Sequence, residues 1–158
     1  MQKASLYHHI ESKADLLWDV ARDGAHAFHA ALDGVPETLG PVERIRAALR
    51  AHLRVVAEQL DIATVFVREW RFLDGERRDE FIAERRRYEE RIRALFRDAV
   101  EQSELRTDLD AGVAALVFLS AANWAYTWLQ PGRDTDELAD RFFDLLVDGM
   151  RGYATPRP

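Results

Sequence analysis

Cysteine is absent from this 158-residue chain, and proline and glycine are scarce, with five and eight residues. Without cysteine there is no disulfide framework, no thiolate metal site and no cysteine nucleophile. The absence fits a reducing compartment, and we expect the protein to be cytoplasmic. The few prolines and glycines cluster at a small number of positions, which indicates long segments separated by short breaks.

Sequence features typical of exported proteins and of common enzymes are also missing. Met1 to Ser5 run directly into polar and aromatic sequence, so we expect no signal peptide. The chain contains no glycine-rich phosphate loop and no serine nucleophile elbow. We therefore expect no enzyme activity, no catalytic residue and no cofactor.

Positive charge is in short supply, because 22 lysines and arginines face 28 aspartates and glutamates and the formal net charge is −6. Nucleic-acid-binding domains are often basic, so most of this chain is not expected to touch DNA. Any DNA contact would have to be local. Lys3 and Lys13 are the only lysine or arginine residues among the first 21 residues.

Helical periodicity dominates what is present. Hydrophobic residues make up 47% and charged residues 32% of the chain, which is typical of a globular domain. Apolar residues recur at helical spacing and no segment alternates as a strand does, so the sequence predicts an all-α fold. The expected helices cover about 13–32 with Ser12 as the N-cap, a segment beginning at Pro41, 61–73, 76–103, 111–129 and 136–153.

Two of these helices have unusual compositions. Residues 111–129 carry no charge, which raises the possibility of a membrane span. We favour a helix outside the membrane, because the segment is rich in alanine and contains Ser120, Asn123 and Thr127. Such a helix must be covered on two sides, by its own domain and by a partner subunit. The Glu/Arg-rich run at 84–91 has mixed signs, which favours a solvated face over a nucleic-acid patch.

The five histidines offer the best alternative for a metal site. His26 and His29 lie one helical turn apart, and Asp23 precedes His26 by three residues. The Glu-x-x-His pairs of di-iron bundles are absent, so we expect no metal. A helical-bundle metalloenzyme remains the less favoured alternative.

One short motif carries the most information. The segment Ser5-Leu6-Tyr7-His8-His9-Ile10-Glu11-Ser12-Lys13-Ala14-Asp15-Leu16-Leu17 closely resembles the end of the DNA-binding domain of the tetracycline-repressor (TetR) family. The resemblance implies that residues 1–12 are a remnant of a helix-turn-helix domain, with the recognition helix at 3–9. Residues 13–158 would then form the ligand-binding and dimerisation domain of a TetR-like helical bundle.

The same resemblance implies which residues face DNA. Lys3 and Ser5 would reach bases or backbone, and Tyr7 and His9 match family positions that contact phosphate. Lys13 sits at a helix N-terminus, which favours an anion. A complete family member has two more helices before this point, whereas Met1 falls where the turn before the recognition helix is expected. We therefore expect the chain as given to bind operator DNA weakly or not at all, and the full-length protein to bind it.

A second segment, Ala122-Asn123-Trp124-Ala125-Tyr126-Thr127-Trp128-Leu129-Gln130-Pro131-Gly132, resembles the Asn-Trp-x-x-x-Trp-x-x-Pro-x-Gly segment of a TetR branch that responds to acyl-CoA thioesters and controls fatty-acid or sterol breakdown. The glycine here directly follows the proline, which departs from that pattern. The resemblance implies a small apolar effector, such as an acyl-CoA, held by aromatic and polar side chains. The alternative is that these aromatic residues belong to the core or to an interface. The candidate ligand-binding residues are Phe66, Trp70, Tyr88, Phe96, Asn123, Trp124, Thr127 and Trp128.

The last two helices are the most apolar, and the TetR family pairs them with the same two helices of a second subunit. The candidate homodimer residues are Val117, Ser120, Ala121, Phe143, Leu146 and Val147. Together, these features predict a ligand-responsive transcriptional repressor that an effector releases from its operator. A helical dimer that binds a small molecule without binding DNA is the alternative.

Overall fold

The computed structural model describes residues 3–129, 134–148 and 150, with side chains described from residue 13 onward. Within these residues the fold is all-α, as predicted. The elements are α1 (Lys3–Asp33), α2 (Pro41–Glu58), α3 (Leu60–Val67), the 3-10 turn η1 (Glu69–Phe72), α4 (Gly75–Glu101), α5 (Ala111–Trp124), the 3-10 turn η2 (Ala125–Thr127) and α6 (Thr135–Asp148).

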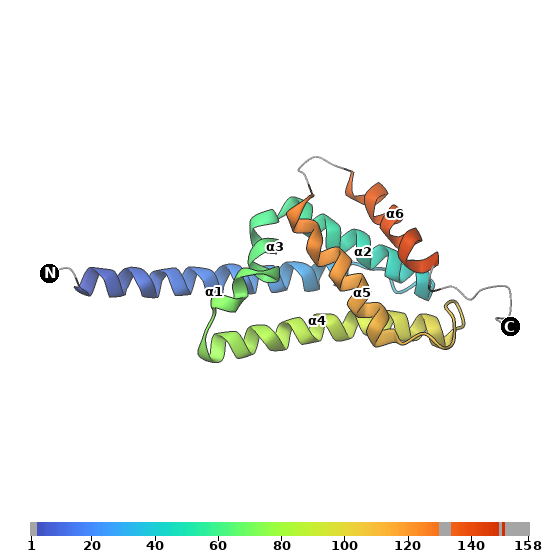
Figure 1. Cartoon of the computed structure of the whole chain (residues 1–158), viewed down its shortest axis with the longest axis horizontal. Helices are drawn as coiled ribbons and strands as arrows, with labels where there is room; N and C mark the ends of the chain where they lie inside the picture. The colour runs from blue at the N-terminus through green and yellow to red at the C-terminus, as the bar shows by residue number, and fades with distance from the viewer. Residues whose placement is uncertain (1–2, 130–133, 149, 151–158) are drawn as a thin grey trace.

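The helices form a bundle from which one end of α1 projects (Figure 1). The helices α1 and α4 run parallel, and ion pairs Arg77–Asp15 and Arg91–Asp33 join them at two heights. The helices α2, α3 and α5 complete the body, and α6 lies on the outer side of α2. Among the described residues, no helix is long and apolar enough to cross a membrane.

The first helix departs from the sequence prediction. We predicted that a helix begins after an N-cap at Ser12, but α1 continues through this position from Lys3 to Asp33. No proline or glycine lies between residue 3 and Gly24, and a serine inside a helix costs only about 0.5 kcal/mol relative to alanine. The prediction that residues 1–12 belong to a DNA-binding domain is separate from this break and stays a prediction.

Two other predicted helices are interrupted by tight turns. The segment 61–73 divides into α3 and η1, and the uncharged segment 111–129 divides into α5 and η2. Thr127 Oγ1 donates to the Trp124 carbonyl at 2.8 Å, which satisfies a carbonyl at the end of α5. The predicted end of the last helix, near residue 153, lies outside the described residues.

Acidic side chains cap three of the helices. The Asp110 carboxylate accepts from the backbone N–H groups of Gly112 and Val113, at 2.8 and 3.0 Å, and so starts α5. Asp134 caps α6 in the same way. At the N-terminus of α2 the capping side chain comes from a residue far away in sequence. The Val42 N–H donates to Glu104 Oε2 at 2.9 Å.

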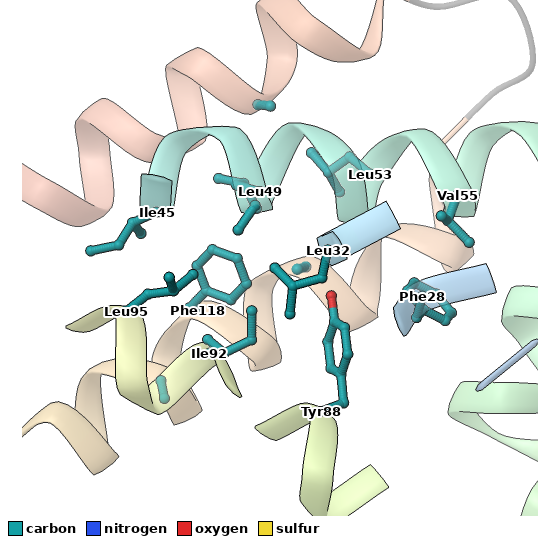
Figure 2. Close-up of a cluster of buried hydrophobic side chains, with 14 of the residues drawn as sticks. Phe28, Leu32, Ile45, Leu49, Leu53, Val55, Tyr88, Ile92, Leu95 and Phe118 are labelled. Atoms are coloured by element: carbon teal, nitrogen blue, oxygen red, sulfur yellow. The ribbon is translucent and has the colours of Figure 1, made fainter. Parts of the chain in front are cut away.

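The core runs between the helices of the bundle, α6 adds to it through its contact with α2, and aromatic and branched side chains fill it (Figure 2). Its largest fully buried side chains are Phe28, Phe81, Phe96, Phe118, Phe143, Ile45, Leu49, Leu53, Ile92, His52, Val56 and Val147. Each buried aliphatic or phenylalanine side chain stabilises the fold by about 1.5–3 kcal/mol relative to exposure. His52 is the only buried polar or charged residue among the described side chains.

A ladder of charges holds α6 against α2. Three arginines spaced by four residues on α2 face three aspartates spaced by four residues on the antiparallel α6, in the pairs Arg54–Asp136, Arg50–Asp140 and Arg46–Asp144. The central pair is bidentate, with Arg50 donating to both oxygens of Asp140 at 2.8 and 2.6 Å. These hydrogen bonds from Arg50 hold the pKa of the Asp140 carboxyl below its usual value.

Removing the central carboxylate tests this ladder. We expect Asp140→Asn to lower the free energy of unfolding by about 1 kcal/mol at pH 7, the upper end for a partly exposed pair. Because the pKa of Asp140 is depressed in the folded chain, its stabilisation is present above the ordinary aspartate pKa of about 3.9 and is lost as pH falls through the folded value. Urea unfolding from pH 7 to pH 3 measures both effects.

Glu137→Gln is the matched control, because Glu137 lies on the same helix but pairs within it, with Arg141. We expect this control to lose only a few tenths of a kcal/mol, as an exposed helical pair does. Equal losses in the two variants would show that the ladder does not hold α6 on α2.

Candidate functional site

Four rings from four helices meet in the interior and form the centre of the candidate site. Phe28 of α1 lies 4.6 Å from His52 of α2, 4.6 Å from Phe66 of α3 and 5.9 Å from Tyr88 of α4, measured between ring centroids. All four side chains are buried. We call this group the ring cluster.

His52 and Tyr88 are joined by a hydrogen bond of 3.0 Å between His52 Nδ1 and the Tyr88 hydroxyl. Figure 2 shows the Tyr88 ring rising from α4 with its hydroxyl pointing toward α2. Burial lowers the pKa of His52 to about 3 and raises the pKa of Tyr88, so both groups are neutral near pH 7. His52 Nε2 is buried and has no hydrogen-bond partner among the described residues.

The aromatic contacts continue outward from the ring cluster. Phe66 contacts Phe81 at 5.5 Å, and Phe81 contacts Trp70 of η1 at 6.0 Å. The guanidinium groups of Arg85 and Arg71 lie 4.8 and 5.2 Å from the centre of the Trp70 ring. We call Trp70, Arg71 and Arg85 the outer cluster.

The outer cluster holds positive charge and unpaired donors. Burial and then the charge of Arg71 lower the pKa of the Arg85 guanidinium. Trp70 Nε1 and Arg85 Nη1 are buried and lack an acceptor among the described residues. Two arginines and an indole N–H without a full set of acceptors are suited to a phosphate or carboxylate.

Two grooves on the surface are lined by residues of the helices that carry the two clusters, although no side chain of either cluster lines them. One of about 530 Å³, between α1, α3 and η1, is lined by Lys13, Ala14, Leu17, Val65, Glu69 and Phe72. Two of its residues, Glu69 and Phe72, are the sequence neighbours of Trp70 and Arg71 in the outer cluster. Another of about 510 Å³ lies between α1 and α2, and Val55 is part of both its wall and the hydrophobic core.

The structure divides the predicted ligand-binding residues into separate groups. Phe66, Trp70 and Tyr88 belong to the aromatic contacts just described, whereas Phe96 packs on Phe118 of α5 at 6.0 Å. The remaining four lie at the end of α5 and just beyond it, at Asn123, Trp124, Thr127 and Trp128.

These four residues differ in exposure. Asn123 Oδ1 is buried without a partner among the described residues, whereas Trp124 is 62% exposed and the Thr127 residue is also exposed. The Trp128 ring stacks on Phe142 of α6 at 5.6 Å, so it connects η2 to α6. Ligand binding by any of the eight residues stays a prediction.

The sequence-based prediction of ligand-binding residues did not include Phe28 and His52, which lie at the centre of the ring cluster. A signal for His52 was present in the sequence. It falls on the same helical stripe as Leu49, Leu53 and Val56, and a polar residue on an apolar stripe is buried. Its partner Tyr88 is 36 residues away, and only the packing of α2 on α4 reveals the pair.

The candidate dimer residues fall into three groups by exposure. Val117 and Ser120 are exposed on α5, where Val113, Leu116 and Trp124 are exposed as well. Ala121 and Leu146 are half-buried.

On α6, Phe143 and Val147 are buried inside the single chain, and Arg46 of α2 stacks over Phe143 at 4.1 Å. The large apolar residue that α6 exposes is Leu145, at 78%. The apolar surface open to a second subunit therefore lies mainly on α5.

The DNA-facing and histidine predictions concern the two ends of α1. The side chains of Lys3, Ser5, Tyr7 and His9 lie outside the described residues, and Lys13 is exposed on α1. His29 connects α1 to α4, with Nδ1 3.1 Å from Arg91 Nη1 and Nε2 3.3 Å from the Glu84 carbonyl. Across residues 13–129 and 134–148, no group of three or more His, Asp or Glu side chains is placed to hold a metal ion.

Comparison with known proteins agrees with this architecture. Residues 38–150 match the family described as tetracyclin repressor-like, C-terminal domain. The chain is thus built as the all-helical C-terminal domain of this class. It belongs to the tetracyclin repressor-like (TetR) family. Comparison with curated proteins finds no match.

Solved structures of regulators share this fold. The TetR family transcriptional regulator PfmR from Thermus thermophilus is 31% identical with a TM-score of 0.80, over 94% of this chain and 82% of that chain. AibR, solved with isovaleryl coenzyme A and operator DNA, is 34% identical with a TM-score of 0.77, over 93% and 81%. FadR from Bacillus subtilis, solved with stearoyl-CoA, shares the fold at 18% identity and a TM-score of 0.71, over 94% and 82%.

The buried histidine makes stability depend on pH. The unfolded chain protonates His52 near pH 6.5 and the folded chain only near pH 3, so the unfolded state binds more protons between these values. The free energy of unfolding therefore falls as pH is lowered from 6.5, by up to about 1.4 kcal/mol per pH unit. We expect His52→Leu to reduce this slope, as measured by urea unfolding at several pH values.

A leucine in place of His52 would leave the Tyr88 hydroxyl unpaired and lower the free energy of unfolding at every pH. The informative quantity is therefore the change of this free energy with pH, and not its value at one pH. His26→Leu is the control, since His26 is exposed on α1 and should leave the slope unchanged. An unaltered slope in the His52 variant would contradict a neutral buried histidine.

Proposed function

We propose that this chain is the ligand-sensing and dimer-forming part of a transcriptional repressor whose effector is an acyl-CoA thioester. The observation that carries the proposal is the run of aromatic contacts from the ring cluster to the outer cluster, with unpaired buried polar atoms at both ends. An amphipathic ligand with an apolar chain and an anionic end matches this distribution. The binding of isovaleryl coenzyme A by AibR, at 34% identity, supports the same ligand class.

In this proposal the acyl chain packs among the rings and the phosphates meet the outer cluster. Phe66 and Tyr88 supply apolar surface, as effector pockets require. Arg85 and Arg71 supply charge-assisted hydrogen bonds to phosphate oxygens, and Trp70 Nε1 supplies a further donor. Phe96, Asn123, Trp124, Thr127 and Trp128 remain candidate ligand contacts from α4, α5 and η2.

The second subunit in this proposal covers α5. Val113, Leu116, Val117 and Trp124 are large apolar residues left exposed on one 14-residue helix and its end, and contiguous exposed apolar surface is typical of interfaces. Leu145 would extend the contact onto α6. The pairing is symmetric, as in most homodimers.

The helix α1 would couple the ligand to DNA. Phe28 lies in the ring cluster, and the same continuous helix leads back to Lys3. The contact of α1 with α3 is close, because a Cβ on Gly24 would lie 3.1 Å from Phe66 Cβ. A ligand that displaces Phe66 therefore also displaces α1.

In the dimer this displacement changes the separation of the two recognition helices, on which Lys3, Ser5, Tyr7, His9 and Lys13 are the proposed DNA contacts. Operator and effector then oppose each other by linkage, and the protein acts as a repressor.

Titration with acyl-CoA compounds tests the effector. We expect isovaleryl-, octanoyl- and stearoyl-CoA to raise the melting temperature, because a ligand at 100 times its Kd stabilises the folded state by about 2.7 kcal/mol. We expect Arg85→Met to weaken binding about tenfold or more in calorimetric titration, since a charge-assisted hydrogen bond contributes about 1.5–3 kcal/mol. No stabilisation by any of the three compounds would contradict the proposal.

Arg141→Met is the matched control for Arg85→Met. Arg141 is exposed on α6 and pairs with Glu137 of the same helix. The affinity of the Arg141→Met variant for acyl-CoA should equal that of the unaltered chain. An equal loss in both variants would indicate non-specific attraction of phosphate to arginine.

Light scattering tests the dimer. We expect the unaltered chain to be dimeric at micromolar concentration and Val117→Glu to be monomeric, because two buried, unpaired carboxylates would face each other across the symmetry axis. Phe72→Glu is the control, since Phe72 is 75% exposed but lies on η1, away from α5. A monomeric unaltered chain would overturn this part of the proposal.

A further inference from the structure

The ring cluster contains a polar atom that the fold itself does not use. His52 is fully buried, and its Nδ1 is occupied by the Tyr88 hydroxyl at 3.0 Å. Its Nε2 is buried and has no partner in the described part of the chain. A buried polar group without a partner is costly, so its persistence in an apolar core needs an explanation.

The hydrogen bond to Tyr88 favours one tautomer of His52. If Nδ1–H donated to the tyrosine oxygen, the phenol proton and the Nε2 lone pair would both be unsatisfied. If instead the Tyr88 O–H donates to Nδ1, the only unsatisfied group is Nε2–H. Burial keeps the phenol protonated, because it raises the pKa of Tyr88, so the phenol has a proton to donate. The second arrangement leaves fewer buried groups unpaired, and His52 then presents Nε2–H as a free donor.

The surroundings of His52 favour a neutral acceptor over an anion. Phe28 lies 4.6 Å from the imidazole ring, and the adjacent buried residues on α2 are Leu49, Leu53 and Val56. A carboxylate placed here would need a buried counter-charge, whereas a carbonyl oxygen would not. The positive charge of the site lies on Arg71 and Arg85, and the Arg85 guanidinium stands over the Trp70 ring and 5.7 Å from the centre of the Phe66 ring.

We propose that His52 Nε2–H donates a hydrogen bond to a carbonyl oxygen of the bound ligand, and that Tyr88 positions the imidazole for this contact. The inference rests on the ligand site proposed above and specifies how that site recognises its ligand. His52 identifies the neutral carbonyl that ends an apolar acyl chain, as in a thioester. The ligand carbonyl would accept from the one donor that the His52–Tyr88 pair leaves unpaired among the described residues.

A pair of matched compounds tests the carbonyl. Octanoyl-CoA and S-octyl-CoA have the same chain length and the same CoA, but a methylene replaces the carbonyl in the thioether. We expect the unaltered chain to bind the thioester about tenfold more tightly, which corresponds to one hydrogen bond. His52→Leu should bind the two compounds equally, and His52→Gln, which keeps an N–H donor, should retain part of the preference.

The outcomes separate this inference from the proposed function. Equal affinity of the unaltered chain for both compounds overturns carbonyl recognition and leaves the acyl-CoA proposal standing. Binding of neither compound overturns both. A preference for the thioester that persists in His52→Leu assigns the carbonyl to another residue and overturns the role of His52.

Nitrogen-15 NMR of the ligand-free chain gives a readout that does not depend on the variants folding. We expect His52 near pH 7 to carry its proton on Nε2, with Nδ1 unprotonated. A proton on Nδ1 would make Nε2 an acceptor and overturn the inference. Tyr88→Phe keeps the aromatic ring and removes only the hydroxyl that bonds His52 Nδ1, so it should broaden the tautomer distribution and reduce the thioester preference.

Discussion

The packing of Phe28 against His52, Phe66 and Tyr88 is the contact on which the arrangement of the other functional elements depends. It joins α1, α2, α3 and α4 at one buried point, and each ring comes from a different helix. From this point α1 extends toward the residues that resemble a recognition helix. The aromatic contacts extend from the same point to Trp70 and the arginines of the outer cluster. Packed rings and one continuous helix therefore connect both ends, and the proposed coupling of ligand to DNA would use this connection.

Charge has different roles in different parts of the molecule. Along α4, Arg93 pairs with Glu89 and Glu90 on the helix surface, so part of the mixed-sign run is a solvated face, as the sequence predicted. Arg91 of the same run reaches α1, and Arg85 is largely buried over Trp70. The arginines of α4 thus have three roles: some belong to the solvated surface, one links α4 to α1, and one is part of a candidate anion site. The role depends on which side of α4 each arginine occupies.

The two ends of the aromatic contacts differ in charge, and the proposed ligand site gives each end a different task. The outer cluster carries net positive charge beside an indole, which suits a phosphate at the edge of the protein. The ring cluster is neutral, because burial disfavours both the imidazolium and the phenolate. Phe66 and Phe81 connect the two, and the Arg85 guanidinium lies 5.7 Å from the centre of the Phe66 ring.

Local sequence features were sufficient to determine the all-α fold, most helix boundaries and the family. Helical periodicity depends on neighbouring residues, glycine and proline mark breaks locally, and the Ser5–Leu17 motif is contiguous. Sequence also placed Phe66, Trp70 and Tyr88 among the candidate contacts, because large aromatic residues on apolar stripes face the interior.

Only the tertiary structure decided which residues meet. The His52–Tyr88 bond and the Arg50–Asp140 pair join residues 36 and 90 positions apart. The burial of Phe143 beneath Arg46 depends on how α6 docks on α2. The physical reason is that periodicity specifies the apolar side of each helix but not its partner, rotation or register. Those follow from the simultaneous packing of all the helices, which no local pattern contains.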